Sequence, residues 1–453
     1  MSIRLEQHRR LNREPVTTDD LEAYFHRACV PASRWRVGAE FEQLALWRAS
    51  GRQVSYGGPE GVGAILRRIA DRYGWTPYFE DGHLVALERE GAVLTFEPGA
   101  QVELATPPAE TLEEVARCLA RHLEELRSVV DPRNIAWVSL GVTPFSADHD
   151  IPLVPKARYR VMADYLPRRS THAHQMMRCT ASTQASYDYP DEQGAGKRFH
   201  VALSLSPFAS AMFANSPVYR GRLTGVLSYR GRIWHEMDPD RSGLLCDLVQ
   251  DEHFSFRRWV DFMLDLPMMF YCLNDRFLPA RGRPFRDFMA HGLDGYYPTL
   301  EDWEMHLTTI FTEVRLKSYL EVRGADATSP ELAMGFVALW KGILHDETAL
   351  EEALILAREV PSACREGLFL EHIARGLQGT YRGRPVHAWC SDLLDIAARG
   401  LERQSRPGRP SEVRFLDPVR EVVADRRSPA ARLAGAWPRL AGDPVRTLEL
   451  VCS

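Results

Sequence analysis

Pairs of glutamates that share one face of an apolar strand are the strongest constraint on how this chain folds. Residues 35–42 (WRVGAEFE) alternate with period two, so the apolar side chains point to one side and Glu40 and Glu42 to the other. This pattern predicts a strand with one buried face. Like charges this close repel each other unless water or a cation lies between them. The polar face is therefore either solvated or part of a cation site.

Two other segments also place a glutamate beside a polar residue on one strand face: Glu103 shares its face with Gln101, and Glu321 shares its face with Arg323. Residues 93–105 predict two strands joined by a turn, with Glu97 beside the turn and Glu103 in the second strand. In residues 318–324, Glu321 lies on one face of a predicted strand. Gathered in one sheet, three such strands would offer several carboxylate oxygens, which suit Mg²⁺ or Mn²⁺ and not Zn²⁺. For a single pair, the solvated face of an antiparallel sheet is the commoner explanation. Three pairs bring the two interpretations close to even, so the residue types alone leave both open.

Arginine is the second feature, because its planar guanidinium suits carboxylate and phosphate groups. Arg158, Arg230 and Arg241 lie in the segments KARYR, SYRGRIW and DPDRSG. Surface salt bridging accounts for most arginines in a chain this rich in them. A phosphate-binding P-loop is absent, since the only Gly-Lys pair, 196–197, is followed by arginine and lacks the earlier glycine. Any phosphate must therefore be bound by arginine and metal.

The rest of the pattern alternates between strands and helices. An amphipathic helix is predicted at 61–73, a second one after the capping box of Thr111 and Glu114, and a buried strand at 136–142. Residues 171–215 mix polar loop with helix and give no clear boundaries. From the Ser-Pro pair at 329–330 onward the chain is predicted to be mainly helical.

The composition and the distribution of apolar residues exclude several classes of protein. Of 453 residues, 45% are hydrophobic, enough for a large core, and the net charge of -5 gives no basic field for nucleic acid. The densest apolar run, 266–273, contains a proline and is far shorter than the ~20 residues of a membrane-spanning helix. The first residues form no apolar signal core, and the 8 cysteines form no CxxC pair. We expect a cytoplasmic protein with reduced thiols that binds neither nucleic acid nor membrane.

Taken in order, eight segments resemble the plant- and proteobacterial-type glutamate–cysteine ligases. They are GAEFEQ (38–43), EPGAQVELATPP (97–108), PKARYRVM (155–162), RCTASTQ (178–184), FANSP (213–217), SYRGRIW (228–234), DPDRSGLL (238–245) and HLTTIFTEVRLKSYLEVRGAD (306–326). The resemblance implies an α+β fold, in which a glutamine-synthetase-like catalytic domain has a central, mainly antiparallel sheet flanked by helices. We expect a helical N-terminal extension at 1–34, the catalytic domain at 35–326, and a mainly helical C-terminal region at 327–453 packed on it.

The same resemblance implies an enzyme, a ligase that uses ATP and Mg²⁺ or Mn²⁺. Such ligases phosphorylate the side-chain carboxylate of glutamate and join it to the amine of cysteine, giving γ-glutamylcysteine. Metal ions that bridge the phosphates cancel the repulsion between the two anions that must meet. The expected partners are small molecules, namely glutamate, cysteine or another amine, and ATP, bound by a monomer or homodimer.

The resemblance also assigns roles to individual residues. Arg323 and Arg241 are the expected catalytic residues. The expected metal ligands are Glu40, Glu42, Glu97, Glu103 and Glu321, and the expected contacts to ATP or substrate are Arg158, Arg230, Arg241, Arg323 and Gln184.

Several positions depart from the family pattern. Phe41 stands between the two glutamates where the residue is often polar, and Ala105 and Thr106 replace the end of an ELSG segment. Ser186 stands where asparagine is expected, Thr312 where a proline is usual, and Ala100 replaces the second glycine of an EPGG turn. None of these changes removes an expected metal carboxylate. They leave two alternatives open. One is a ligase of the same family with another amino acid or amine as acceptor, in a specialised biosynthetic pathway. The other is a non-catalytic paralogue that binds a nucleotide or amino acid.

Overall fold

The alternating segment forms the strand β1 (Val37–Trp47), which is longer than predicted. The computed structural model describes residues 15–244, 254–274, 276–406, 408–440 and 442–452. Within these ranges, β1 is an inner strand of a nine-stranded sheet with the order β14-β15-β7-β1-β5-β4-β3-β2, and β6 pairs with the far end of β1. Every strand pair of this sheet is antiparallel, which confirms the predicted fold class.

The other strands of the sheet agree with most of the predicted segments. The two strands predicted around the turn are β4 and β5, the strand at 318–324 is β15, and the strand at 136–142 is the shorter β6. The central strand β7 was not predicted. The bounds are β2 (Thr76–Glu80), β3 (His83–Arg89), β4 (Ala92–Phe96), β5 (Val102–Ala105), β6 (Ile135–Val138), β7 (Ser182–Tyr187), β14 (Val314–Leu316) and β15 (Leu320–Asp326).

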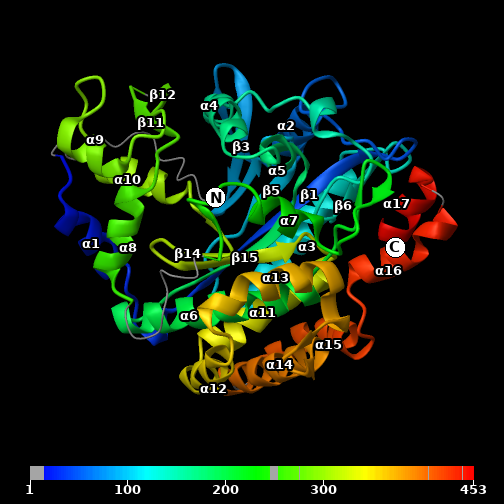
Figure 1. Cartoon of the computed structure of the whole chain (residues 1–453). Helices are drawn as coiled ribbons and strands as arrows, with labels where there is room; N and C mark the ends of the chain where they lie inside the picture. Colours follow the sequence, from blue (N-terminus) through cyan, green and yellow to red (C-terminus); the bar gives the residue numbers. More distant parts are fainter. Residues whose placement is uncertain (1–14, 245–253, 275, 407, 441, 453) are drawn as a thin grey trace.

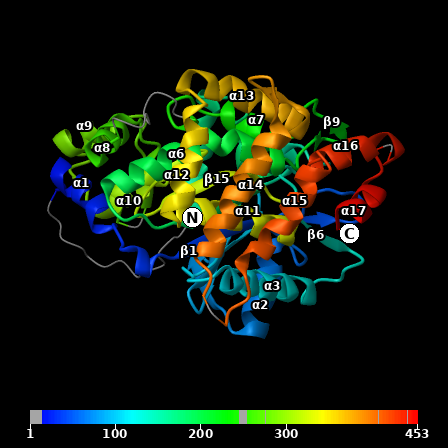
Figure 2. The same cartoon turned by 90° about the horizontal axis from the view of Figure 1, so that it is seen from below.

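One face of the sheet is apolar and is covered by the helices α3 (Leu112–Ser128), α6 (Glu192–Met212) and α11 (Pro330–Leu344). Tyr187 of β7 points to this side and donates a hydrogen bond to Val337 O of α11 at 2.8 Å. Ser210 of α6 donates to Gly324 O of β15 at 3.3 Å. In Figure 1 α6 and α11 lie beneath the sheet, and Figure 2 shows α11, α14 (Val386–Arg403) and α12 (Glu347–Arg358) from below. The opposite, polar face is therefore left to the functional side chains.

Helix signals in the sequence agree well with the structure. The helix predicted at 61–73 is α2 (Val62–Tyr73), and α3 begins at the predicted capping box of Thr111 and Glu114. The Ser-Pro pair begins α11. The remaining helices are α1 (Thr18–Arg27), α4 (Ala157–Tyr165), α5 (Ala173–Cys179), α7 (Tyr229–His235), α8 (Phe256–Asp265), α9 (Phe285–His291), α10 (Leu300–Leu307), α12 (Glu347–Arg358), α13 (Ser362–Arg375), α14 (Val386–Arg403), α15 (Asp417–Ala424), α16 (Pro429–Leu440) and α17 (Pro444–Cys452).

The C-terminal part is mainly helical, with one small hairpin of β16 (Thr380–Tyr381) and β17 (Arg384–Pro385). Small strand pairs also form between β8 (Val218–Tyr219) and β9 (Arg222–Leu223), between β10 (Ser242–Gly243) and β13 (Phe311–Thr312), and between β11 (Phe270–Leu273) and β12 (Arg276–Pro279). The division into three regions remains a prediction, and residues 1–14 of the expected N-terminal extension lie outside the described residues. The seven described cysteines form no disulfide bond with one another, and Cys246 is not among them. Among the described helices, none is long and apolar enough to cross a membrane.

Two glycines allow the backbones of α11 and α14 to touch. A Cβ added at Gly400 of α14 would lie 1.9 Å from Gly342 O of α11, and one added at Gly342 would lie 2.3 Å from Ala397 O. Both obstacles are backbone atoms, which cannot rotate away. The contact of these two helices, which lie behind the sheet, therefore depends on the absence of side chains here.

We expect Gly400→Ala to lower the free energy of unfolding by about 3 kcal/mol, because the added methyl group forces the helices apart. Gly367→Ala in α13 is the matched control, since a Cβ there meets no atom within 4 Å. The control should raise stability by about 0.5–1 kcal/mol through helix propensity. Calorimetric melting of both variants measures the difference. Equal melting temperatures for the two variants would contradict this interpretation of the helix contact.

Candidate active site

The register of the sheet brings the predicted carboxylates together on its polar face. Glu42 of β1 lies directly opposite Glu103 of β5. Glu40, two residues earlier on β1, lies opposite Gln184 of β7. Opposite residues of an antiparallel pair point to the same side, as do residues i and i+2 of one strand. These four side chains therefore project from one face, the one away from α3, α6 and α11.

Glu42 is held by three hydrogen bonds. Its Oε2 accepts from the Ser182 amide at 2.9 Å, and its Oε1 accepts from the Ser182 hydroxyl at 2.9 Å and from Gln184 Nε2 at 3.1 Å. Burial nevertheless raises the pKa of Glu42 to about 7, and the nearby charge of Glu97 adds to the shift. The carboxylate is thus fixed in place by neutral donors, and the charge of Arg230 offsets only part of the effect of burial.

The pKa of Glu103 is raised further than that of Glu42. Glu103 is only 2% exposed, and its Oε1 accepts a hydrogen bond from Thr95 Oγ1 at 3.2 Å. Burial raises its pKa to about 8, with further contributions from Glu40, Glu97 and Glu42. Several carboxylates therefore lie close enough to repel one another inside the protein, as the sequence pattern suggested.

Glu97 is placed by the turn that follows β4. Its amide donates to Gln101 O and its carbonyl accepts from the Ala100 amide, both at 2.9 Å. Ala100 has φ = 69°, a left-handed conformation that explains why a glycine is usual there. Gly99 passes so close to Arg178 O that an added Cβ would lie 2.2 Å from it. The turn is therefore fixed by backbone contacts.

Glu321 has a different environment from the other carboxylates. It lies opposite Ser186 on β7 and is fully buried. Lys317 Nζ donates to its Oε1 at 3.2 Å, Arg323 Nη1 donates to its Oε2 at 3.2 Å, and Arg315 Nε forms a further bond to Oε2. Although burial acts to raise it, the pKa of Glu321 is held well below its usual value by these three cations. Glu321 is thus the shared counter-ion of a buried basic cluster.

Gln184 connects the carboxylates of β1 and β5 to the basic cluster around Glu321. Its Nε2 donates to Glu42, while its Oε1 accepts from Arg323 Nη1. Glu40 lies close enough to Glu321 and Lys317 for both charges to act on its pKa: Glu321 raises it and Lys317 lowers it. The predicted residues of the carboxylate face, namely Glu40, Glu42, Glu97, Glu103, Glu321, Gln184 and Arg323, therefore form one connected group.

Arg230 of α7 lies over this face with part of its guanidinium unused. Its Nη2 donates to Arg323 O at 3.0 Å, and its Nη1 lies 3.9 Å from Asp326 Oδ1. Its Nε and Nη1 are buried without a hydrogen-bond partner. The charge of Arg230 acts on Glu42, Glu313 and Asp326. Arg230 therefore keeps N–H groups available for an anionic ligand.

Arg158 of α4 borders the acids from another side. It is 8% exposed, and its guanidinium carbon lies 5.5 Å from the ring centre of Phe270. Burial lowers its pKa, while the charges of Glu97 and Glu103 act against that shift. The neighbouring Lys156 is also buried, donates to Phe96 O at 2.9 Å, and has its pKa lowered by burial to about 8. Arg158 thus lies on the side of the face that carries Glu97 and Glu103.

Arg241 makes a different set of contacts from the one we expected. Its Nε donates to Asp238 Oδ2 at 2.8 Å, its Nη1 to Thr309 O and Oγ1 at 3.3 Å, and its Nη2 to Pro267 O. The side chain is completely buried. All three guanidinium nitrogens are used by these contacts, so they support a structural role for Arg241, and its catalytic role remains an untested prediction.

Several polar residues of the site were not among the predicted ligands. Ser182 binds Glu42, and Asp326 accepts from the Asn215 amide at 2.7 Å, Ser216 Oγ at 2.6 Å and Ser228 Oγ at 2.9 Å. Asp326 thereby fixes the loop and the N-cap from which Arg230 extends. Residues 182 and 326 each lie within a segment that resembles the family. Their contacts join residues far apart in the sequence, so no local sequence pattern predicts them.

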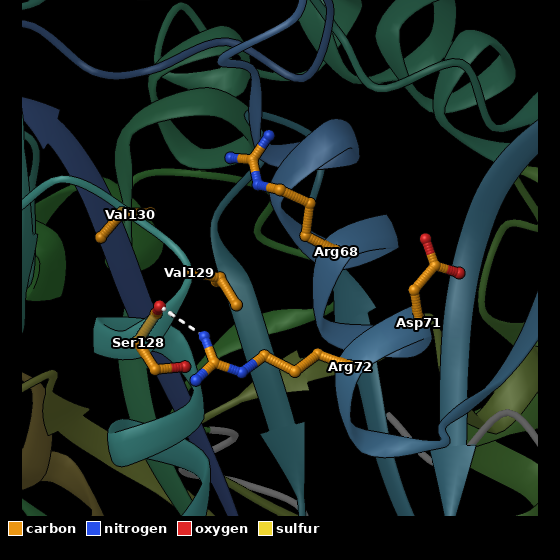
Figure 3. Close-up of a pocket in the computed structure, with 6 residues that line it drawn as sticks. All are labelled: Arg68, Asp71, Arg72, Ser128, Val129 and Val130. Carbon is orange, nitrogen blue, oxygen red and sulfur yellow. Dashed lines mark hydrogen bonds between the residues drawn. The ribbon is translucent and has the colours of Figure 1, made fainter.

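A surface pocket lies elsewhere in the molecule, between the end of α3 and α2. It is lined by Arg68, Asp71, Arg72 and residues 128–130 (Figure 3). Arg72 Nη1 donates to Ser128 O at 3.0 Å across it. None of the predicted site residues lines this pocket, so the buried polar face of the sheet is the better candidate for the active site.

Comparisons with known proteins agree with this site. A family model described as "Glutamate-cysteine ligase family 2 (GCS2)" matches residues 36–439. The chain is 36% identical over 427 residues to chloroplastic glutamate–cysteine ligase A of Oryza sativa subsp. indica, covering 94% of this chain and 85% of that protein. It is also 36% identical over 439 residues to the chloroplastic enzyme of Nicotiana tabacum, covering 95% and 82%.

A solved structure shares the fold. Glutamate–cysteine ligase from Francisella tularensis, in complex with AMP, superposes with a TM-score of 0.55 at 13% identity, covering 92% of this chain and 87% of that one. The names of the plant relatives also correct one expectation. These relatives are chloroplastic enzymes, which contradicts the cytoplasmic location expected from the sequence.

Proposed function

The chain belongs to the glutamate–cysteine ligase family 2, and on that premise we propose that it is the ATP-dependent ligase that makes γ-glutamylcysteine. ATP phosphorylates the side-chain carboxylate of glutamate. The amine of cysteine then attacks the acyl phosphate, giving the amide, ADP and phosphate. The observation that supports this most is the group of buried carboxylates on one face of the sheet, bordered by Arg230, whose Nε has no hydrogen-bond partner.

The donor set of this face fits Mg²⁺ or Mn²⁺. Glu42 and Glu103 are buried side by side, and burial together with the neighbouring carboxylates raises the pKa of both above the ordinary value. Both offer only oxygen atoms, as hard divalent cations prefer. We assign Glu40, Glu42, Glu97 and Glu103 as the residues that would hold the metal. When bound, it would neutralise the phosphates of ATP as they approach the glutamate carboxylate.

Glu321 has a supporting part in this proposal. Both of its oxygens are engaged by Arg315, Lys317 and Arg323, so its main task is to keep three cations together next to the acids. Through Gln184, Arg323 is also tied to Glu42. This network holds the guanidinium of Arg323 at the border between the acidic and basic halves, where a transferring phosphoryl group would need stabilisation.

The arginines supply the anion contacts. The Nε of Arg230, which is buried without a hydrogen-bond partner, can donate to an oxygen of a carboxylate or phosphate. Arg158 lies on the side of Glu97 and Glu103. We therefore propose that Arg230 and Arg158 hold the α-carboxylate of glutamate or the phosphates of ATP, while Arg323 contacts the reacting groups.

Phosphate release tests the proposed reaction. The purified chain is mixed with ATP, Mg²⁺ and glutamate, with and without cysteine, and the product is identified by mass spectrometry. We expect cysteine-dependent phosphate release and γ-glutamylcysteine in equal amounts. Release that depends on a different amine in a panel of amino acids would instead favour an altered acceptor, and the absence of release with every acceptor would reject the proposal.

The raised pKa values of Glu42 and Glu103 predict how Mg²⁺ binding depends on pH. In the metal-free protein, the folded state favours the neutral acids, whereas the unfolded chain ionises near its ordinary pKa of about 4.3. These two groups therefore reduce stability as pH rises from about 4.3 toward 8, the higher of their folded pKa values. Mg²⁺ requires the ionised forms, so its stabilising effect should grow over the range from about 7 to 8.

Melting curves with and without Mg²⁺ between about pH 6 and pH 9 measure this effect. The increase in melting temperature caused by Mg²⁺ should be larger at the alkaline end, and protons should be released on binding. The same increase at every pH, or a larger one at the acidic end, would show that these acids do not bind the metal.

A further inference from the structure

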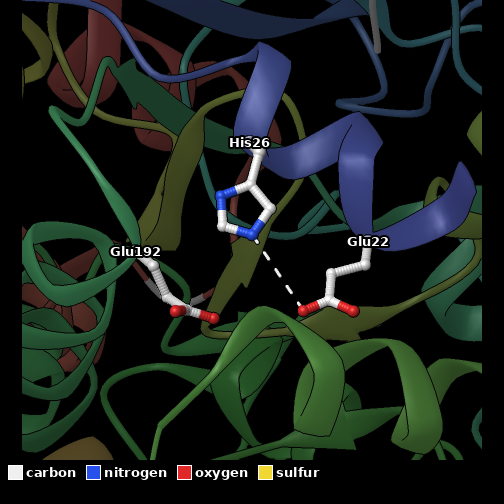
Figure 4. Close-up of side chains that lie close together, drawn as sticks. All are labelled: Glu22, His26 and Glu192. Atoms are coloured by element: carbon white, nitrogen blue, oxygen red, sulfur yellow. Dashed lines mark ion pairs between the residues drawn. The ribbon is translucent and has the colours of Figure 1, made fainter. Parts of the chain in front are cut away.

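A second cluster of metal-ligating side chains lies outside the active site, on the surface where α1, α6 and α8 meet. It consists of Glu22 and His26, four residues apart on α1, and Glu192, the first residue of α6. One ligand atom from each lies within 4.8 Å of the others. Figure 4 shows the imidazole of His26 above the two carboxylates. Helix geometry explains the first pair, since residues i and i+4 lie on the same face.

Contacts outside the cluster fix the orientation of all three side chains. Arg257 Nε donates to Glu22 Oε2 at 2.7 Å, which leaves Oε1 directed toward His26 Nε2, 4.0 Å away. Glu192 Oε1 accepts from the Phe256 amide at 2.6 Å, which leaves its second oxygen for another partner. The His26 ring packs edge-on against Phe256, with centroids 4.9 Å apart. Such outer contacts are those that orient the ligands of metal sites.

The donor atoms determine which cation fits. One imidazole and two carboxylates form a mixed nitrogen and oxygen set, which suits Zn²⁺ and related transition metals better than Mg²⁺. Ligand atoms that share a tetrahedral Zn²⁺ lie roughly 3.4 Å apart. Small rotations of these exposed or half-buried side chains would bring the ligand atoms from the 4.8 Å limit to that separation. Water can supply the fourth ligand. We propose that Glu22, His26 and Glu192 form a binding site for a divalent transition-metal ion of the Zn²⁺ type.

A metal ion here would connect segments that are distant in the sequence. Glu22 and His26 belong to α1, whereas Glu192 begins the long helix α6, which contacts the catalytic sheet at β15. The residues that orient the ligands, Phe256 and Arg257, begin α8. Binding therefore fastens the N-terminal helix to the body of the enzyme, and its direct effect is on stability.

Zinc titration of the full chain tests this site separately from the active site. The protein is freed of metal with a chelator, placed in excess Mg²⁺ to saturate the acids of the sheet, and titrated with Zn²⁺ against a chromophoric chelator. We expect one Zn²⁺ per chain and a higher melting temperature. His26→Ala should weaken Zn²⁺ binding at least tenfold and abolish the thermal shift, and Glu192→Gln should weaken binding similarly. Because His26 is exposed, its variant should fold normally.

Two variants serve as controls. His83→Ala removes an exposed histidine elsewhere on the surface, and Cys29→Ser removes a thiol that lies just after α1. Both should bind Zn²⁺ like the unchanged protein. Failure of the unchanged protein to bind Zn²⁺ would overturn the proposal. It would also be overturned if His26→Ala bound Zn²⁺ as tightly as the unchanged protein, or if Cys29→Ser alone lost it.

Discussion

Replacing Glu103 with glutamine is expected to lower kcat/KM about a thousandfold, roughly 4 kcal/mol of lost transition-state stabilisation. Glutamine keeps the shape of the side chain but cannot carry the charge that a metal ion requires. The metal-free protein should be as stable as before near neutral pH, because burial raises the pKa of Glu103 to about 8 and the acid is already mostly neutral there. This variant should therefore lose activity while its stability stays the same.

Steady-state kinetics and melting of the metal-free protein measure the two effects. Glu88→Gln in β3 is the control, since Glu88 is a carboxylate of the same sheet that accepts a hydrogen bond from Tyr78 at 2.8 Å outside the site. The control should keep nearly full activity. Normal turnover by Glu103→Gln would show that Glu103 takes no part in the reaction.

Replacing Glu321 with glutamine is expected to reduce both activity and stability, the latter by about 3–5 kcal/mol. The change leaves Arg315, Lys317 and Arg323 buried together without their shared counter-ion. Uncompensated buried charge is costly, so the protein should unfold at a distinctly lower temperature. This result would distinguish Glu321 from Glu103, for which the structure predicts a loss of activity alone.

A double variant checks the reason for that loss. Lys317→Met removes one of the three cations and keeps the length of the side chain. Combined with Glu321→Gln, it should cost less stability than the sum of the two single changes, because fewer like charges remain together. If Glu321→Gln alone melts like the unchanged protein, or if the two costs simply add, the ion pairs around Glu321 do not stabilise the fold as we infer.

Local patterns in the sequence were sufficient for the elements that border the site. Period-two alternation identified β1, and the capping box of Thr111 and Glu114 identified the start of α3. Because side-chain direction follows from these periods, the sequence also predicted correctly that Glu40 and Glu42 share a face. The pairing of Glu42 with Glu103 depends on register, which the sequence does not determine, and it became clear only in the sheet.

β7 was missed because its alternation lacks large apolar residues. Its polar face carries Ser182, Gln184 and Ser186, and its other face carries threonine, alanine and tyrosine, so the contrast in hydrophobicity is weak. The surroundings of Glu321 were hidden for a different reason. Arg315 reaches it from the neighbouring strand β14, and a cross-strand pair leaves no mark in the local sequence.

Arg241 shows the limit of reasoning from residue type. An arginine in a segment that resembles the family was expected to bind phosphate, yet in the structure its guanidinium is bonded to Asp238, three residues earlier, and to backbone carbonyls. Arg230 was predicted on the same grounds, and it keeps two nitrogens unpartnered. The difference lies in tertiary contacts that spacing along the chain does not reveal.

The position of Mn²⁺ in crystals grown with an ATP analogue is the most direct test of the proposed site. Anomalous scattering locates the metal without reference to the surrounding protein. We predict peaks within about 2.5 Å of carboxylate oxygens of Glu42 and Glu103, on the face of the sheet opposite α11. Peaks found only at other carboxylates, with Glu42 and Glu103 bonded to protein groups alone, would contradict the assignment of this face as the centre of catalysis.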